Sequence, residues 1–194
     1  MKIQKYQQYS ILAALLLIIS IPLPFWTVIM DAPSYPERNL SMRVYTDHYE
    51  GDIREWNVVG NLVGVKVPPP IPEIVFVVVP IAVYILIGLS LLAVFIPKIL
   101  KLSALGPWIT LVALTIWTQY SLYVFGHDLA EDRPLRYVDP FTPPVIGVKK
   151  IGSMVTYHLP HVGSLLLVIS GILLYLAYRN YVKEGKNEKL VEKA

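Results

Sequence analysis

The sequence predicts an all-α integral membrane protein with four transmembrane helices. Of its 194 residues 55% are hydrophobic and only 16% are charged, whereas soluble domains are roughly 45–50% apolar and about 25% charged. The apolar residues are also gathered into four long runs, at residues 11–30, 74–97, 103–125 and 162–181. Each run holds enough residues for a helix to cross a hydrocarbon core about 30 Å thick.

The first run, Ile11–Met30, carries no charge and follows an N-terminal segment with Lys2 and Lys5. A cleaved signal peptide would also begin with basic residues. The length of the run and the lack of an A-x-A-like site after it favour a retained helix. We expect Pro22 and Pro24 to kink the outer part of this helix, because proline removes a backbone donor and clashes with the preceding turn.

Residues 31–73 form the first polar segment, and two periodicities occur in it. Leu40–Thr46 alternates apolar and polar residues, which predicts a short strand. Residues 52–63 place apolar side chains at helical spacing, which predicts an amphipathic helix. Asp52 followed by Glu55 predicts a capping box at its start. Residues 126–161 form the second polar segment, which is rich in proline.

The distribution of Lys and Arg predicts the orientation of the four helices. Both termini and the turn near residue 100 together carry nine Lys and Arg but three Glu, whereas residues 31–73 and 126–161 carry eight Lys and Arg and eleven acids. The positive-inside rule therefore places both termini and the tail 182–194 in the cytoplasm, with both polar segments as extracytoplasmic loops. We expect a multi-pass protein of the cytoplasmic membrane. Because the basic residues are not clustered on a soluble module, no nucleic-acid partner is expected.

Several classes of chemistry are disfavoured by what the chain lacks. There is no cysteine, which excludes disulfides, thiolate nucleophiles and thiolate metal sites. The central parts of the four spans contain no Asp, Glu, Lys, Arg or His, and proton relays and ion pathways depend on such residues. A transporter acting alone and a haem buried at mid-membrane are therefore disfavoured. No Walker, H-E-x-x-H or G-x-S-x-G motif supports an enzyme.

The histidines are the candidate metal ligands, and all four fall in the predicted outer loops: His48, His127, His158 and His161. Imidazole is a common ligand of copper, zinc and iron. If the third and fourth spans pack together, the last three imidazoles would lie near one plane at the membrane surface. The sequence also allows a haem or a quinone that contacts His127 and His161 at the membrane surface. Ordinary surface histidines are the alternative, and an outer histidine acting as acid or base in a membrane enzyme is a further hypothesis.

Short motifs in both loops add a resemblance to a known group of proteins. The matching residues are Tyr35, Pro36, Gly51, Asp52, Glu55, Asn61 and Gly64 in the first loop, and Gly126, His127, Pro134, Pro140, Phe141, Thr142, Pro143 and Gly147 in the second. In these the chain resembles small four-helix membrane proteins, of unsettled role, encoded with nitrous-oxide reductase and its copper-maturation factors. Where that group reads N-H-Y-I-G-M, residues 61–65 of this chain read N-L-V-G-V. The missing His and Met argue against a copper role.

The leading functional hypothesis is a non-enzymatic accessory or subunit protein of an extracytoplasmic or respiratory membrane complex. It would act through its two outer loops, folded on each other, and would bind the lipid bilayer and other membrane or extracytoplasmic subunits. This follows from the contrast between long, structured loops and spans that lack chemistry. The alternative is an outer-face protein that binds or handles a metal such as copper, or a haem, through His127, His158 and His161.

Overall fold

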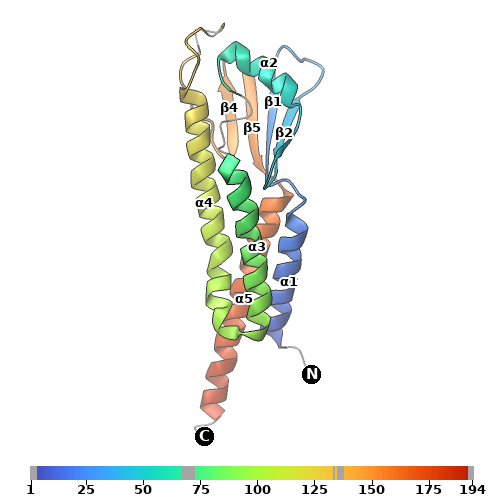
Figure 1. Ribbon diagram of the computed structural model, residues 1–194, viewed down its shortest axis with the longest axis vertical. Helices are drawn as coiled ribbons and strands as arrows, with labels where there is room; N and C mark the ends of the chain where they lie inside the picture. The colour runs from blue at the N-terminus through green and yellow to red at the C-terminus, as the bar shows by residue number, and fades with distance from the viewer. Residues whose placement is uncertain (1–3, 67–72, 133, 135–137, 192–194) are drawn as a thin grey trace. The chain divides into compact units, whose positions relative to one another are not determined.

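The fold combines helices with a sheet, so the all-α prediction was wrong. A computed structural model describes residues 4–66, 73–132, 134 and 138–191 (Figure 1). In chain order its elements are α1 (Lys5–Ser20), β1 (Trp26–Asp31), β2 (Leu40–Val44), β3 (Tyr49–Gly51), α2 (Ile53–Val63), α3 (Glu73–Phe95), the 3₁₀-helix η1 (Pro97–Ile99), α4 (Leu100–His127), β4 (Gly147–Ile151), β5 (Met154–Pro160) and α5 (Val162–Val191).

These elements form two compact units, each with its own contacts. The helical unit comprises the described residues of Met1–Leu23, Pro80–Val112 and Gly163–Ala194. The sheet unit comprises those of Pro24–Val79 and Ala113–Val162. All strands and α2 belong to the sheet unit, whereas α1 and most of α5 belong to the helical unit.

Three helices of the described chain are long and apolar enough to cross a membrane, over Ile74–Phe95, Pro97–His127 and Val162–Gly185. They correspond to the second, third and fourth predicted spans. The prediction of a first span over Ile11–Met30 was wrong, because α1 has 16 residues and ends at Ser20. Pro22 and Pro24 follow that end, and proline cannot continue the hydrogen bonding of a helix.

The chain beyond these prolines forms a strand instead of the outer end of a helix. Strand β1 is the centre of a five-stranded antiparallel sheet with the order β3-β2-β1-β5-β4. Its β-branched residues Thr27, Val28 and Ile29 suit a pleated sheet. In the register, Val28 lies opposite Met42 of β2 and His158 of β5. The two polar segments are thus joined in one sheet, and the strand predicted at residues 40–46 is confirmed as β2.

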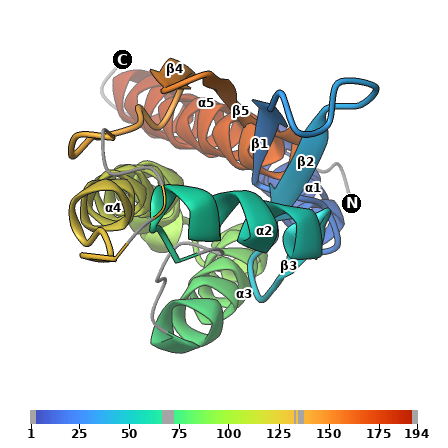
Figure 2. The same ribbon diagram turned by 90° about the horizontal axis from the view of Figure 1, so that it is seen from above.

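Helix α2 covers one face of this sheet, and its buried side packs with residues of the strands in the core of the sheet unit (Figure 2). The helix predicted over residues 52–63 is confirmed, with Trp56, Val59 and Val63 on its buried side. The predicted capping box is wrong, because the Asp52 side chain makes no capping hydrogen bond. Its carboxylate instead accepts a bond from the Ser41 backbone N–H at 2.8 Å, which ties the start of α2 to β2.

The helical unit has its own interior of small and apolar side chains. One cluster of buried residues joins Tyr6 of α1 to Ala93, Leu100 and Ala177, and another joins Ala13, Ala104 and Leu174. The other sides of these helices expose large apolar side chains, among them Leu15, Ile85, Ile109 and Ile172. Such an arrangement is unfavourable in water and suits lipid, which favours contact with a bilayer.

Candidate functional site

The four histidines all lie in the sheet unit, in different settings. His48 is exposed in the turn between β2 and β3, and His127 is exposed at the end of α4, where its Nδ1 lies 2.9 Å from the Tyr123 carbonyl oxygen. His161 follows β5, and its Nδ1 accepts a bond from the backbone N–H of Val162 at 2.8 Å. His158, within β5, is buried.

A shared metal centre for these residues stays a prediction. Within the described part of the chain, His, Cys, Asp and Glu form no group of three or more that could hold a metal ion. His127, His158 and His161 are therefore not gathered as a three-ligand set there. The haem and quinone hypotheses likewise stay predictions.

His48 belongs to a charged cluster at the surface. Its Nδ1 lies 2.6 Å from the Asp47 carboxylate and its Nε2 lies 3.4 Å from that of Glu50, while its ring stacks on Tyr45 with centroids 4.4 Å apart. The hydrogen bond to Asp47, with a smaller effect of Glu50, raises the pKa of His48. This cluster is exposed, so solvent screens its ion pairs and they contribute little to stability.

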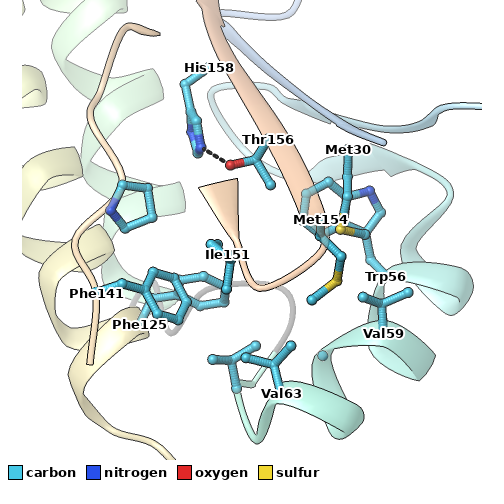
Figure 3. A pocket seen from close by; sticks show the side chains of 13 residues that line it. Met30, Trp56, Val59, Val63, Phe125, Phe141, Ile151, Met154, Thr156 and His158 are labelled. Carbon is cyan, nitrogen blue, oxygen red and sulfur yellow. Dashed lines mark hydrogen bonds between the residues drawn. The ribbon is translucent and has the colours of Figure 1, made fainter. Parts of the chain in front are cut away.

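The hydrogen bonds of His158 fix its tautomer (Figure 3). Its Nε2 lies 3.0 Å from the Thr156 hydroxyl oxygen, and that hydroxyl donates its single hydrogen to the Lys149 carbonyl at 3.2 Å. The hydroxyl oxygen must therefore accept a hydrogen from Nε2. Burial lowers the pKa of His158 to about 4, so the ring is neutral at physiological pH. The lone pair is then on Nδ1, for which no partner occurs among the described residues.

An apolar cavity of about 40 Å³ adjoins His158 (Figure 3). Met30, Trp56, Phe125, Phe141 and Met154 contribute to its walls. The indole N–H of Trp56 is buried and, in the described structure, also lacks a hydrogen-bond partner. The cavity is large enough for a few atoms rather than for a drug-sized molecule. Sequence reasoning selected His158 but did not predict its burial, and Trp56 was not selected.

The second face of the sheet, turned away from α2, exposes apolar side chains. Side chains alternate between the two faces along a strand, so Tyr157 and Leu159 point away from the face that holds His158. Tyr157 lies between Ile29 and Val148 in the register. Val148 is 58% exposed, Leu159 45% and Tyr157 39%. We call these four residues, Ile29, Val148, Tyr157 and Leu159, the open face.

The alternation of side chains along β5 is the sequence signal of the open face. Residues 154–160, M-V-T-Y-H-L-P, alternate in exposure, with Met154, Thr156 and His158 buried.

Comparison of the chain with protein-family models and with curated proteins gives no match. The open face and the surroundings of His158 are therefore the features from which we infer a function.

Proposed function

We propose that the protein is a membrane-anchored accessory subunit of an extracytoplasmic or respiratory membrane complex, and that it binds a protein partner through the open face. The observation that carries this proposal is the exposure of Val148, Tyr157 and Leu159 on neighbouring strands. The anchor would be the helical unit, with the sheet unit outside the cytoplasm.

The chemistry of the open face supports binding of a protein surface. Antiparallel sheets with one packed face usually present polar side chains on the other. Here Ile29, Tyr157 and Val148 form one row across β1, β5 and β4, and Leu159 lies in the next row. Contiguous exposed apolar residues that are rimmed by polar groups are typical of protein interaction sites.

Charged side chains surround the apolar residues of the same face. Arg43 of β2 and Lys150 of β4 are exposed and lie on either side of the central strands β1 and β5. Arg43 is opposite Thr27, and Lys150 is opposite Val155, so both share the face of Tyr157. Two exposed acids share this face, because Glu50 lies opposite Arg43 and Asp31 lies opposite Val155. A partner surface with an apolar centre and a rim of both charge signs would complement this arrangement.

Two valines of similar exposure allow a matched test. Val148, 58% exposed, lies on the open face, and Val58, 51% exposed, lies on α2. Tagged wild-type protein and the variants Val148→Asp and Val58→Asp would be purified from native membranes in mild detergent. We expect the same stoichiometric partner with wild type and Val58→Asp, and at least a tenfold loss with Val148→Asp, because a buried unpaired charge opposes association. A partner retained equally by both variants contradicts the proposal.

A second candidate function is the handling of a soft metal ion, which one observation favours. The Nδ1 lone pair of His158 is unused in the described structure, and the thioethers of Met30 and Met154 line the same cavity. Imidazole and thioether ligands together suit Cu(I). Of the four histidines, this candidate involves only His158.

A further inference from the structure

Five cationic side chains lie at one end of the helical unit. They are Lys5 of α1, Lys98 of η1 and Lys101 of α4 at the turn after α3, and Arg179 and Lys183 of α5. Each of the five is exposed. Glu184 is the one carboxylate among the helical-unit side chains that the structure describes, so the cations outnumber the acids there.

Packing within the helical unit brings these residues together. Tyr6 beside Lys5, Leu100 beside Lys101, and Ala177 near Arg179 belong to one buried cluster. The rings of Tyr6 and Tyr181 meet edge to face with centroids 5.6 Å apart. The Gln7 side-chain amide of α1 also donates to the Val94 carbonyl at the end of α3, at 3.1 Å. The cations therefore surround one end of the helical unit.

The neighbours of these cations are apolar and exposed. Phe95 is 82% exposed beside the turn, and Ile96 and Leu102 are exposed next to Lys98 and Lys101. Tyr9, Tyr178 and Tyr181 are partly buried against the same cluster. Tyrosine rings and lysines at the end of an apolar helix are typical of the headgroup level of a bilayer, where the apolar neighbours reach the acyl chains.

We propose that this end of the helical unit, which we call the basic collar, is a binding site for anionic phospholipid headgroups. The ammonium groups of Lys98 and Lys101 would contact the lipid phosphate, with Lys5, Arg179 and Lys183 increasing the local positive potential. The adjacent Phe95, Ile96 and Leu102 would pack against the acyl chains of the same lipid. The inference requires insertion into a bilayer and does not depend on the partner of the open face.

The test uses the full chain in a neutral detergent and adds phosphatidylglycerol or phosphatidylcholine as probes. Phosphatidylglycerol should raise the thermal unfolding midpoint more than phosphatidylcholine, and native mass spectrometry should show it retained at several-fold higher occupancy. The double variant Lys98→Gln, Lys101→Gln should lose at least half of this difference. The matched double variant Lys149→Gln, Lys150→Gln removes the same charge from β4 and should keep it.

Other outcomes decide against the collar. Equal effects of the two lipids on the wild type, or equal losses in the two double variants, would overturn the proposal. Inorganic phosphate reproducing the effect of phosphatidylglycerol would also overturn it, because the site would then not need the acyl chains. If Lys98→Gln, Lys101→Gln does not fold, Arg179→Gln, Lys183→Gln replaces it, and the wild-type lipid preference should fall several-fold in 0.5 M salt. A preference that is unchanged by salt contradicts an electrostatic site.

Discussion

Replacement of His158 by phenylalanine should reduce the dependence of the stability of the sheet unit on pH. His158 is 3% exposed and its folded-state pKa lies at about 4, below the ordinary value of 6.5. The unfolded chain therefore takes up a proton on this residue as the pH falls through 6.5, while the folded chain stays neutral until about pH 4. Because the unfolded state binds more protons in this window, the free energy of unfolding decreases as the pH is lowered.

The magnitude follows from the lowered pKa. One pKa unit corresponds to about 1.36 kcal/mol, so the fall from 6.5 to about 4 removes about 3 kcal/mol of stability below pH 4. About 2 kcal/mol of this is lost by pH 5. At pH 7.5 the variant loses the hydrogen bond to Thr156, which is unfavourable. It also removes the buried Nδ1 that lacks a partner in the described structure, which is favourable. These changes oppose each other and leave stability within about 1 kcal/mol of wild type.

The assay is urea unfolding in detergent micelles at pH 7.5, 6 and 5, followed by tryptophan fluorescence. The sheet unit contains Trp26, whose ring centroid lies 5.4 Å from that of His158, and Trp56 beside the same cavity. The control is His127→Phe, which removes an exposed histidine. His48 has a raised pKa and contributes with the opposite sign, stabilising the fold at low pH, but it is present in all three proteins and cancels in the comparison.

The expected result is a wild type that loses about 2 kcal/mol more than His158→Phe between pH 7.5 and pH 5. His127→Phe should follow the wild type. Equal pH dependence of wild type and His158→Phe would refute the inference that a neutral, buried imidazole is present in β5.

Two further predictions concern a close backbone contact and a metal. A Cβ at Gly126 would overlap the Phe141 carbonyl oxygen, so Gly126→Ala should destabilise the sheet unit by about 3 kcal/mol or more. The control is Gly88→Ala, where a Cβ would meet nothing within 4 Å, and it should change stability by less than about 1 kcal/mol. Equal melting temperatures of the two variants would contradict this. If the second candidate function holds, wild-type protein loaded with Cu(I) should retain one ion in elemental analysis. His158→Phe should lose this ion and His127→Ala should keep it. A wild type without stoichiometric metal excludes a Cu(I) site.

Hydropathy and periodicity predicted part of the fold. Composition and run length identified the three helices that are able to cross a membrane. Spacing of side chains identified β2 and α2, since both have one side buried and the other in solvent. These features depend on neighbours in the sequence, so a single chain is enough to find them.

The first apolar run was misread because hydropathy does not distinguish a helix from a buried strand. Residues 26–30 are as apolar as the helix before them, and their strand conformation depends on pairing with β2 and β5. The local signal was the pair Pro22 and Pro24. We expected these prolines to kink a longer helix, but they lie after the end of α1. Strand β5 was missed for a similar reason, because it pairs with a segment more than 120 residues earlier. Strand β4 pairs locally with β5, from Ile151 opposite Met154, and its strand conformation depends on β5.

The candidate site was predicted only at the level of residue type. The sequence marked His158 as a possible ligand but grouped it with His127 and His161. Its burial follows from its place opposite Val28 in the sheet, which only the register shows. Tyr157 and Leu159 belong to the open face because they alternate with His158 along β5.

The most direct test of the central claim is site-specific photocrosslinking in native membranes. A photoreactive amino acid at position 157, on the open face, should crosslink to the same partner that copurifies with the wild type, and the reactive group at position 58 on α2 should not. Three results would contradict an accessory subunit that binds its partner through the open face. They are a crosslink from position 58 alone, equal crosslinks from both positions, and a crosslink from position 157 only to a second copy of this chain.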